Sequence, residues 1–192
     1  MKFRELKEIV KCDLYRAIGD SSCLSFCKQL ILGESFKYIF WMRLTYFLHK
    51  NGALFKPLFI LSYFILKHYR YKFGIYLPYK TTVGKGFYIG HFGGIVINEQ
   101  CVIGENCNIS HCVTLGVSNR GSRKGCPEVG NNVYIAPGVK IIGAVKIGNN
   151  AAIGANAVVT KDLPDNSVAV GIPAKIISFE GSAGYINKIK PE

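Results

Sequence analysis

An aliphatic residue recurs every six positions between Val83 and Val159 of this 192-residue chain. The later members of the series are Val129, Ile135, Ile141, Ile147, Ile153 and Val159, and the earlier ones are Val83, Ile89, Ile95, Ile97, Ile103, Ile109 and Leu115. A period of six fits neither an amphipathic helix nor a half-buried strand. It is typical of a parallel β-helix, in which each hexapeptide forms one side and three sides complete a coil of about 18 residues.

Small residues commonly follow these aliphatic residues, as at Gly104, Gly130, Gly148 and Gly154. The aliphatic side chain can then fill the interior while the small residue lets the backbone turn a corner. We therefore predict a mainly β fold, in which a left-handed parallel β-helix of hexapeptide repeats follows a small α-helical N-terminal domain.

The repeat is interrupted twice. Between Ile95 and Ile97 the register shifts by two residues, which predicts a bulge or a tight corner in this part of the chain. Such features re-aim side chains and are frequent beside active sites. Residues 117–128 leave the period altogether and are polar, basic and glycine-containing, which predicts a protruding loop. A long loop in a compact fold is usually functional, although a tolerated surface insertion is the alternative.

The residues before the repeat have helical periodicity instead. Four segments show it, near 3–18, 24–32, 36–49 and 54–71. We therefore expect a basic and aromatic helical domain at 1–74, the β-helix at 75–177 with its loop at 117–128, and a C-terminal tail at 178–192.

Basic charge is concentrated in the helical part. Residues 1–80 hold fourteen Lys and Arg against five Asp and Glu, and no acidic residue occurs between Glu34 and Glu99. Basic side chains interleaved with aromatic ones suit an anionic surface, and we expect peripheral contact with an anionic membrane. The alternative is that the aromatic residues form an ordinary core. No nucleic-acid-binding motif accompanies the charge, so we expect no nucleic-acid partner.

The apolar run at 57–66 is about half the length that a membrane-spanning helix needs. The charged start of the chain lacks the apolar core of a signal peptide. The seven cysteines are scattered without a CxxC pair, which predicts neither a metal site nor a disulfide framework. We therefore expect a cytoplasmic protein, either free or on the inner face of the cell membrane.

Two of the four histidines lie in the repeat. His91 is beside the register shift and is flanked by glycines, and His111 follows twenty residues later. A separation of about one coil places both on neighbouring coils, where they can face one cleft. We expect His91 to be catalytic and His111 to have a catalytic, a structural or an acceptor-binding role.

Three segments carry a resemblance to a known family. They are GFYIGHFGGIVI at 86–97, ISHCVTLG at 109–116 and VAVGIPAK at 168–175. Together they resemble the serine acetyltransferase branch of the hexapeptide acyltransferases. Within that branch the chain looks closest to bacterial polysaccharide O-acetyltransferases of the colanic-acid type, on the residues at 77–81, 119–121 and 126–127. The resemblance implies acetyl-CoA as co-substrate, no metal, and a homotrimer with active sites between neighbouring β-helices.

The chain departs from that family at three polar positions. His91 matches the family's catalytic histidine, but Tyr76 and Gly90 stand where the family has aspartates, and Cys126 stands where it has a second histidine. A pocket without those groups lacks partners for the charges of free serine. We therefore expect O-acetylation of a sugar hydroxyl on a bacterial surface polysaccharide or its precursor, with a free, polymeric or lipid-linked glycan as acceptor. The alternatives are a serine O-acetyltransferase and a non-catalytic, membrane-associated scaffold.

The expected chemistry is direct attack of the acceptor hydroxyl on the thioester. A histidine imidazole, with an unperturbed pKa of about 6.5, is mostly neutral at pH 7 and can act as the general base. That base is His91, oriented by Glu99, Tyr76 or a backbone carbonyl. Backbone N–H groups at the small-residue corners are expected to stabilise the oxyanion. A minor alternative uses Cys112 or Cys126 as an acyl-carrying nucleophile.

The remaining expected site residues bind the two substrates. The acceptor pocket is expected to include Tyr76, Tyr88, Gly90 and Cys126. By resemblance, the pantetheine arm of CoA runs along small residues near Ala136 and Ala155. The phosphates are expected to meet Lys161, Lys175, Arg120 and Arg123.

Overall fold

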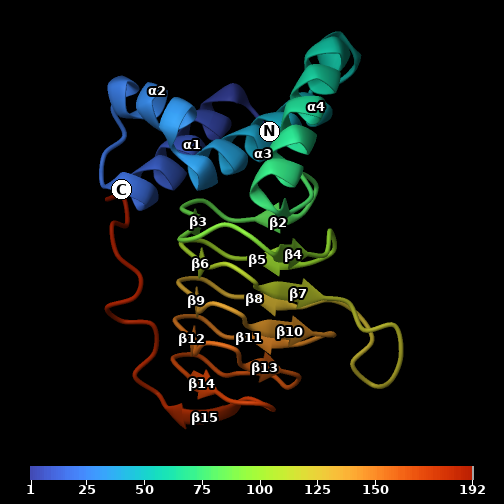
Figure 1. Ribbon diagram of the computed structural model, residues 1–192, viewed down its shortest axis with the longest axis vertical. Coiled ribbons are helices and arrows are strands. Elements are labelled where there is room, and N and C mark those ends of the chain that lie inside the picture. The colour runs from blue at the N-terminus through green and yellow to red at the C-terminus, as the bar shows by residue number, and fades with distance from the viewer. Residues whose placement is uncertain (192) are drawn as a thin grey trace.

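Four α-helices form a cap on one end of a stack of β-coils in the computed structural model, which describes residues 1–191 (Figure 1). The helical elements are α1 (Phe3–Ile18), α2 (Cys23–Leu32), α3 (Glu34–Lys50), the 3-10 turn η1 (Ala53–Phe55) and α4 (Lys56–Phe73). They fall where the sequence shows helical periodicity. Left-handed glycines end two of them, Gly19 after α1 and Gly74 after α4, as is common at helix C-termini.

Short strands build three sheets along the stack. Sheet A contains β1 (Ile75–Tyr76), β4 (Ile95–Ile97), β7 (Thr114–Gly116), β10 (Lys140–Ile142) and β13 (Val158–Val159). Sheet B contains β2 (Thr82–Val83), β5 (Val102–Ile103), β8 (Glu128–Val129) and β11 (Lys146–Ile147). Sheet C contains β3 (Tyr88–Ile89), β6 (Asn108–Ile109), β9 (Tyr134–Ile135), β12 (Ala152–Ile153), β14 (Val168–Val170) and β15 (Lys175–Ser178).

The strands of successive coils pair in parallel, and β15 joins β14 antiparallel at the end of the stack. The predicted helical region followed by parallel β-coils is therefore confirmed. The left-handed sense of the coil stays a prediction.

The six-residue period is the spacing of the buried interior. Leu115 lies opposite both Ile97 and Ile141, and Ile141 lies opposite Val159, so the aliphatic side chains stack from coil to coil. All four are buried. Full burial of such a side chain stabilises a fold by about 1.5–3 kcal/mol, so this column contributes strongly to the stability of the β-helix.

Asparagine residues turn the corner between sheets B and C. Asn106, Asn132, Asn150 and Asn166 all have left-handed φ values, which asparagine tolerates better than most residues. Neighbouring side chains tie the coils together here. Asn131 Oδ1 accepts from the N–H of Glu105 at 2.8 Å, and Asn149 Oδ1 accepts from that of Asn131 at 2.8 Å.

Both predicted interruptions are present. The coil that pairs Ile89 with Ile109 is two residues longer than the coil that pairs Ile135 with Ile153. The extra residues lie in the corner between β3 and β4, where Gly93 and Gly94 have φ values of 107° and 64°. Residues 117–128 protrude from the stack (Figure 1), and an antiparallel bridge between Ser118 and Gly125 closes the base of this loop.

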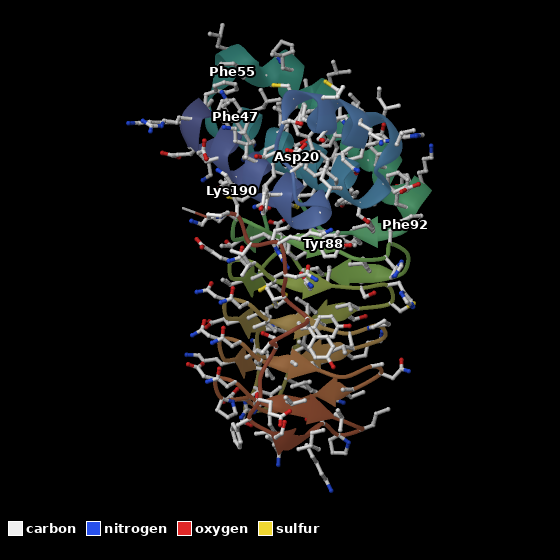
Figure 2. All side chains as sticks on the ribbon, turned by 90° about the vertical axis from the view of Figure 1, so that its left-hand side faces the viewer. Asp20, Phe47, Phe55, Tyr88, Phe92 and Lys190 are labelled. Carbon is white, nitrogen blue, oxygen red and sulfur yellow. The ribbon has the colours of Figure 1, made fainter. Side chains whose placement is uncertain are left out.

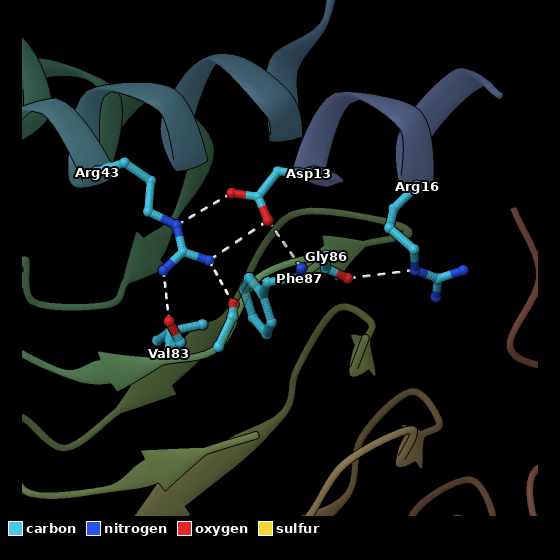
Figure 3. A network of polar contacts seen from close by, with 7 residues as sticks. Asp13, Arg16, Arg43, Val83, Gly86 and Phe87 are labelled. Atoms are coloured by element: carbon cyan, nitrogen blue, oxygen red, sulfur yellow. Dashed lines mark hydrogen bonds and ion pairs between the residues drawn. The ribbon is translucent and has the colours of Figure 1, made fainter. Parts of the chain in front are cut away.

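A buried ion pair joins the helical cap to the first coil (Figure 3). Arg43 Nε on α3 donates to Asp13 Oδ2 on α1 at 3.0 Å, and Asp13 Oδ1 accepts from the N–H of Phe87 at 2.9 Å. The same guanidinium donates to the carbonyls of Val83 and Gly84. Burial raises the pKa of Asp13, while Arg43 and the N–H of Phe87 act against that rise. One carboxylate thus fixes two helices and the first coil together.

The C-terminal tail returns along sheet C to the helices (Figure 1). The ring of Tyr185 stacks on that of Tyr134 with centroids 4.4 Å apart, and Asn108 Nδ2 donates to the Tyr185 carbonyl at 3.0 Å. Near the end of the chain Lys190 pairs with Glu8 of α1, and Figure 2 shows Lys190 beside the helices. The tail therefore covers sheet C and leaves the edge between sheets C and A open.

Candidate active site

His91 and His111 lie one above the other at the edge between sheets C and A, which we call the C–A edge. His91 is in the corner between β3 and β4, and His111 is in the corresponding corner of the next coil, between β6 and β7. Their ring centroids are 6.0 Å apart with an interplanar angle of 73°. Both side chains are exposed in the single chain. The spacing in the sequence therefore predicts their proximity correctly.

The His91 corner is supported from above by helix α4. The ring of Phe92 packs on Phe73 at the end of α4 with centroids 5.3 Å apart, and Phe73 stacks on Tyr69 at 5.3 Å. Figure 2 shows Phe92 at this junction of cap and coil. From below, the N–H of Cys112 donates to the Gly93 carbonyl at 2.8 Å. Contacts on both sides therefore hold the two extra residues of this coil, and they fix the backbone that carries His91.

The same edge continues down the stack as a column of small residues. The N–H of Gly138 donates to the His111 carbonyl at 3.0 Å, and that of Asn156 donates to the Pro137 carbonyl at 2.9 Å. Ala136 and Ala155 lie in these two corners, Ala136 buried and Ala155 exposed. The turn after β14, at residues 171–174, ends the column. The predicted pantetheine-binding residues thus share an edge with the two histidines.

The hydrogen bonds between these corners affect the expected oxyanion site. The N–H groups of Cys112, Gly138 and Asn156 are bonded to carbonyls of the preceding coil. They are therefore engaged within the stack and not directed at a substrate. Of the backbone donors expected to stabilise the oxyanion at the small-residue corners, these three are not free.

Glu99 lies away from His91. It follows β4, in the corner between sheets A and B, which we call the A–B edge, and pairs there with Lys80 at 4.0 Å. His91 precedes β4, so the width of sheet A separates the two corners. The structure therefore does not bring Glu99 to His91 as an orienting carboxylate.

Cys126 also lies on the A–B edge. Its Sγ is 3.8 Å from Gln100 Oε1, and it packs against the interior beside Cys101. Burial raises the pKa of Cys101 to about 12, and the neighbouring Cys126 adds to the rise. Cys126 is thus placed with a second thiol and not with the histidines of its own chain.

The basic residues expected at the CoA phosphates are divided between two places. Arg123, in the loop, pairs with Asp162 at 2.7 Å, which lowers the pKa of that aspartate. Arg120 and Lys161 lie on the same A–B side of the stack. Lys175 begins β15 and is exposed at the end of the C–A column. Within one chain, the two arginines and Lys161 are at the opposite side of sheet A from the histidines.

The expected acceptor residues Tyr76, Tyr88 and Gly90 do not form one pocket. Tyr76 lies on the outer face of β1, with the Arg70 guanidinium 4.4 Å above its ring. Tyr88 and Gly90 line a cavity of about 150 Å³ beneath the helices, together with Glu34. This cavity adjoins the His91 corner through Gly90, whereas Tyr76 is on sheet A.

Lys140 is near the histidines but was not expected from the sequence. It lies on β10, in register with Thr114 of the next coil up, and its Nζ donates to the Cys112 carbonyl beside His111. Because of the intervening loop, Lys140 comes 29 residues after His111 in the sequence, and this separation gives no sign that it lies beside the Cys112 carbonyl. Ser110 Oγ lies 3.4 Å from Nδ1 of His111. Within residues 1–191, no group of three His, Cys, Asp or Glu side chains is arranged to hold a metal ion.

Comparison with known proteins shows similarity along nearly the whole chain. A family model described as bacterial transferase hexapeptide (six repeats) matches residues 127–161. A serine acetyltransferase of Bacillus pumilus is 31% identical over 181 residues, which are 94% of this chain and 80% of that protein. One from Staphylococcus aureus is 42% identical over 112 residues, which are 58% of this chain and 53% of the relative, so the match spans about half of its length.

Solved structures of similar proteins agree with these relatives. A serine acetyltransferase of Neisseria gonorrhoeae superposes with a TM-score of 0.75 at 31% identity, covering 91% of this chain and 66% of that one. A serine acetyltransferase in complex with CoA superposes with a TM-score of 0.73 at 27% identity, covering 91% of this chain and 71% of that one. The similarity therefore includes the helical cap as well as the β-coils.

Proposed function

The chain belongs to the serine acetyltransferase family of hexapeptide-repeat transferases, and on that premise we propose that it transfers an acetyl group from acetyl-CoA to the hydroxyl of L-serine. Family membership rests on 31% identity over 94% of the chain. The observation that carries the site is the pair of exposed imidazoles 6.0 Å apart on the C–A edge.

The prediction of a polysaccharide O-acetyltransferase of the colanic-acid type is wrong, because the relatives that match over most of the chain are named serine acetyltransferases. The glycan acceptor was inferred from Tyr76, Gly90 and Cys126 as if they shared one pocket. The structure places them on β1, at the C–A edge and at the A–B edge of the same chain. Within a single chain these three positions therefore do not line one pocket. A non-catalytic scaffold is likewise not supported.

In the proposed reaction His91 is the general base. The serine hydroxyl oxygen attacks the thioester carbonyl of acetyl-CoA while the imidazole removes the hydroxyl proton. The C–S bond then breaks, and the CoA thiolate takes up a proton as it leaves. Because the thioester is already activated, no acyl-enzyme is needed. Gly90 and Gly93 beside His91 leave room for the two substrates to approach the corner.

His111 and Lys140 complete the proposed acceptor site. The His111 ring lies edge-on to that of His91, one coil further down, and so offers a second polar group to the acceptor. The Lys140 ammonium is held at the Cys112 carbonyl beside it. We assign this cation to the carboxylate of serine or to a CoA phosphate.

The proposed assembly is a homotrimer, as is typical of hexapeptide-repeat acyltransferases. In one chain both histidines are exposed, and the open C–A edge has no opposing wall. A neighbouring β-helix would supply that wall. Its A–B edge would bring Arg120, Arg123 and Lys161 to the acetyl-CoA that lies along Ala136 and Ala155.

The proposal is tested by incubating the purified protein with acetyl-CoA and L-serine and measuring O-acetylserine by mass spectrometry. We expect saturable product formation, loss of product in His91→Ala, and retention in His68→Ala, a matched exposed histidine on α4. L-Threonine and L-homoserine serve as alternative acceptors. The proposal fails if the wild-type protein binds acetyl-CoA yet forms no O-acetylserine.

A further inference from the structure

Helix α4 exposes large apolar side chains along its first half. Leu61 and Phe64 are 58% and 60% exposed, and Leu58 and Ile60 are also exposed, as is Leu54 in the preceding turn η1. Figure 1 shows the N-terminal end of α4 projecting beyond the other helices. Several large apolar side chains on one helix side form a patch of the kind that marks an interaction surface.

These side chains are not part of the helical core. The side of α4 that faces α3 carries Ser62, Leu66 and Phe73, which are buried, and the partly buried Phe59. With 3.6 residues per turn, Ile60 and Phe64 lie on the opposite side. The aromatic residues of the helical region are thus divided. Phe47 is buried and Phe40, Trp41 and Phe59 are partly buried in core positions, whereas Phe64 is exposed.

The second half of the same outward side is basic. Lys67 and Lys72 are exposed there, and Lys56 is exposed at the start of the helix. Helix α4 has no acidic residue, and neither has any other segment between Glu34 and Glu99. The surface therefore changes along the helix from apolar to cationic, without a negative charge to neutralise it.

We propose that α4 docks the protein on an anionic phospholipid surface. The apolar side chains of Leu61 and Phe64 would enter the boundary between headgroups and acyl chains, and Lys67 and Lys72 would meet the lipid phosphates. Contact is peripheral, since within residues 1–191 no helix has both the length and the hydropathy to cross a bilayer.

The charge pattern favours lipid over a second copy of the same surface. Two α4 helices related by a two-fold axis would present this surface to itself. Where the basic ends of the two copies meet, Lys67 and Lys72 of one copy would face those of the other, and like charges across an interface oppose association. An anionic lipid surface complements both the cationic and the apolar part.

The test is flotation of the full-length protein with vesicles of phosphatidylglycerol and phosphatidylcholine, compared with vesicles of phosphatidylcholine alone. We expect flotation with the anionic vesicles at low salt and a marked loss at high salt. Leu61→Ser/Phe64→Ser should lower vesicle affinity at least about tenfold, because two large apolar side chains would no longer be buried at the lipid boundary. Lys67→Gln/Lys72→Gln should reduce binding to anionic vesicles specifically.

The control is Leu24→Ser/Ile31→Ser on α2, which removes two apolar side chains that are even more exposed, at 81% and 73%, from another helix and should float like the wild type. The proposal is overturned if the wild type stays in the bottom fraction with anionic vesicles at low salt. It is also overturned if the α2 variant loses binding as much as the α4 variant. A third contrary result is that Leu61→Ser/Phe64→Ser lowers the mass of the protein in solution, since a second copy would then occupy the surface.

Discussion

Removal of the Asp13 carboxylate should destabilise the junction between the helical cap and the first coil. Asp13→Ala deletes the acceptor for Arg43 Nε at 3.0 Å, for Arg43 Nη2 at 3.4 Å and for the N–H of Phe87 at 2.9 Å (Figure 3). Arg43 would keep its bonds to the carbonyls of Val83 and Gly84 but lose its counter-ion. Because its side chain is only 9% exposed, water cannot replace the carboxylate.

The magnitude follows from the uncompensated charge. Breaking a buried ion pair on one side costs about 3–5 kcal/mol, even though the intact pair contributes little net stability. In a domain of this size that corresponds to a fall in Tm of about 10 °C. Asp13→Asn keeps an acceptor for Phe87 and should cost less. In Asp13→Ala/Arg43→Met the charge is absent, so the double variant should cost less than the sum of the single ones.

Thermal unfolding followed by circular dichroism, at matched protein concentration, gives the Tm of each variant. Glu8→Ala is the control, because it breaks an exposed ion pair on the same helix and should hardly change Tm. If the Tm of Asp13→Ala lies within about 2 °C of the wild-type value, the expected cost of leaving Arg43 without its counter-ion is excluded. Strict additivity in the double variant would likewise show that the two side chains are not coupled.

Two further predictions concern the β-coils. Gly104→Ala should lower the free energy of unfolding by about 1–3 kcal/mol, because an added Cβ would lie 2.5 Å from the Gly130 carbonyl oxygen. Gly90→Ala is the control, since the nearest contact of its Cβ would be at 3.6 Å, and it should unfold in denaturant like the wild type. Equal stability of the two variants would contradict this prediction. Burial raises the pKa of Cys107 to about 12. Iodoacetamide at pH 8 should therefore modify the exposed Cys23 and Cys27 in the native protein and Cys107 only after unfolding, as peptide mass spectrometry would show. Rapid labelling of Cys107 in the native protein would contradict its burial inside the coils.

The six-residue period predicts the coils well because each buried aliphatic residue has the same environment in every coil. It also predicts which residues meet. Corners recur about every six residues, so His91 and Glu99 fall at different corners of one coil, whereas His91 and His111 share an edge in successive coils. The same rule could have excluded Glu99 as a partner of His91, since eight residues are more than one side of the coil.

Contacts that bridge the loop or the two ends of the chain had no such periodic signal. Lys140 meets the Cys112 carbonyl beside His111 only because the loop at 117–128 leaves the stack before β8 and returns in register. The contact of Tyr185 with Tyr134 depends on how the tail folds back over sheet C. Helical periodicity located α4, but packing against α3 decides that Phe59 is half-buried and Phe64 exposed.

The most direct test of the account is the turnover number of His91→Ala with acetyl-CoA and L-serine. Loss of a general base at the C–A edge should lower kcat by about a hundredfold or more. The assembly mass and CoA affinity of the variant should match those of the wild type, because the His91 side chain is exposed in the single chain and the residues proposed to bind CoA lie further down the edge. A kcat equal to that of the wild type would contradict the assignment of His91 as the base and transfer that role to His111.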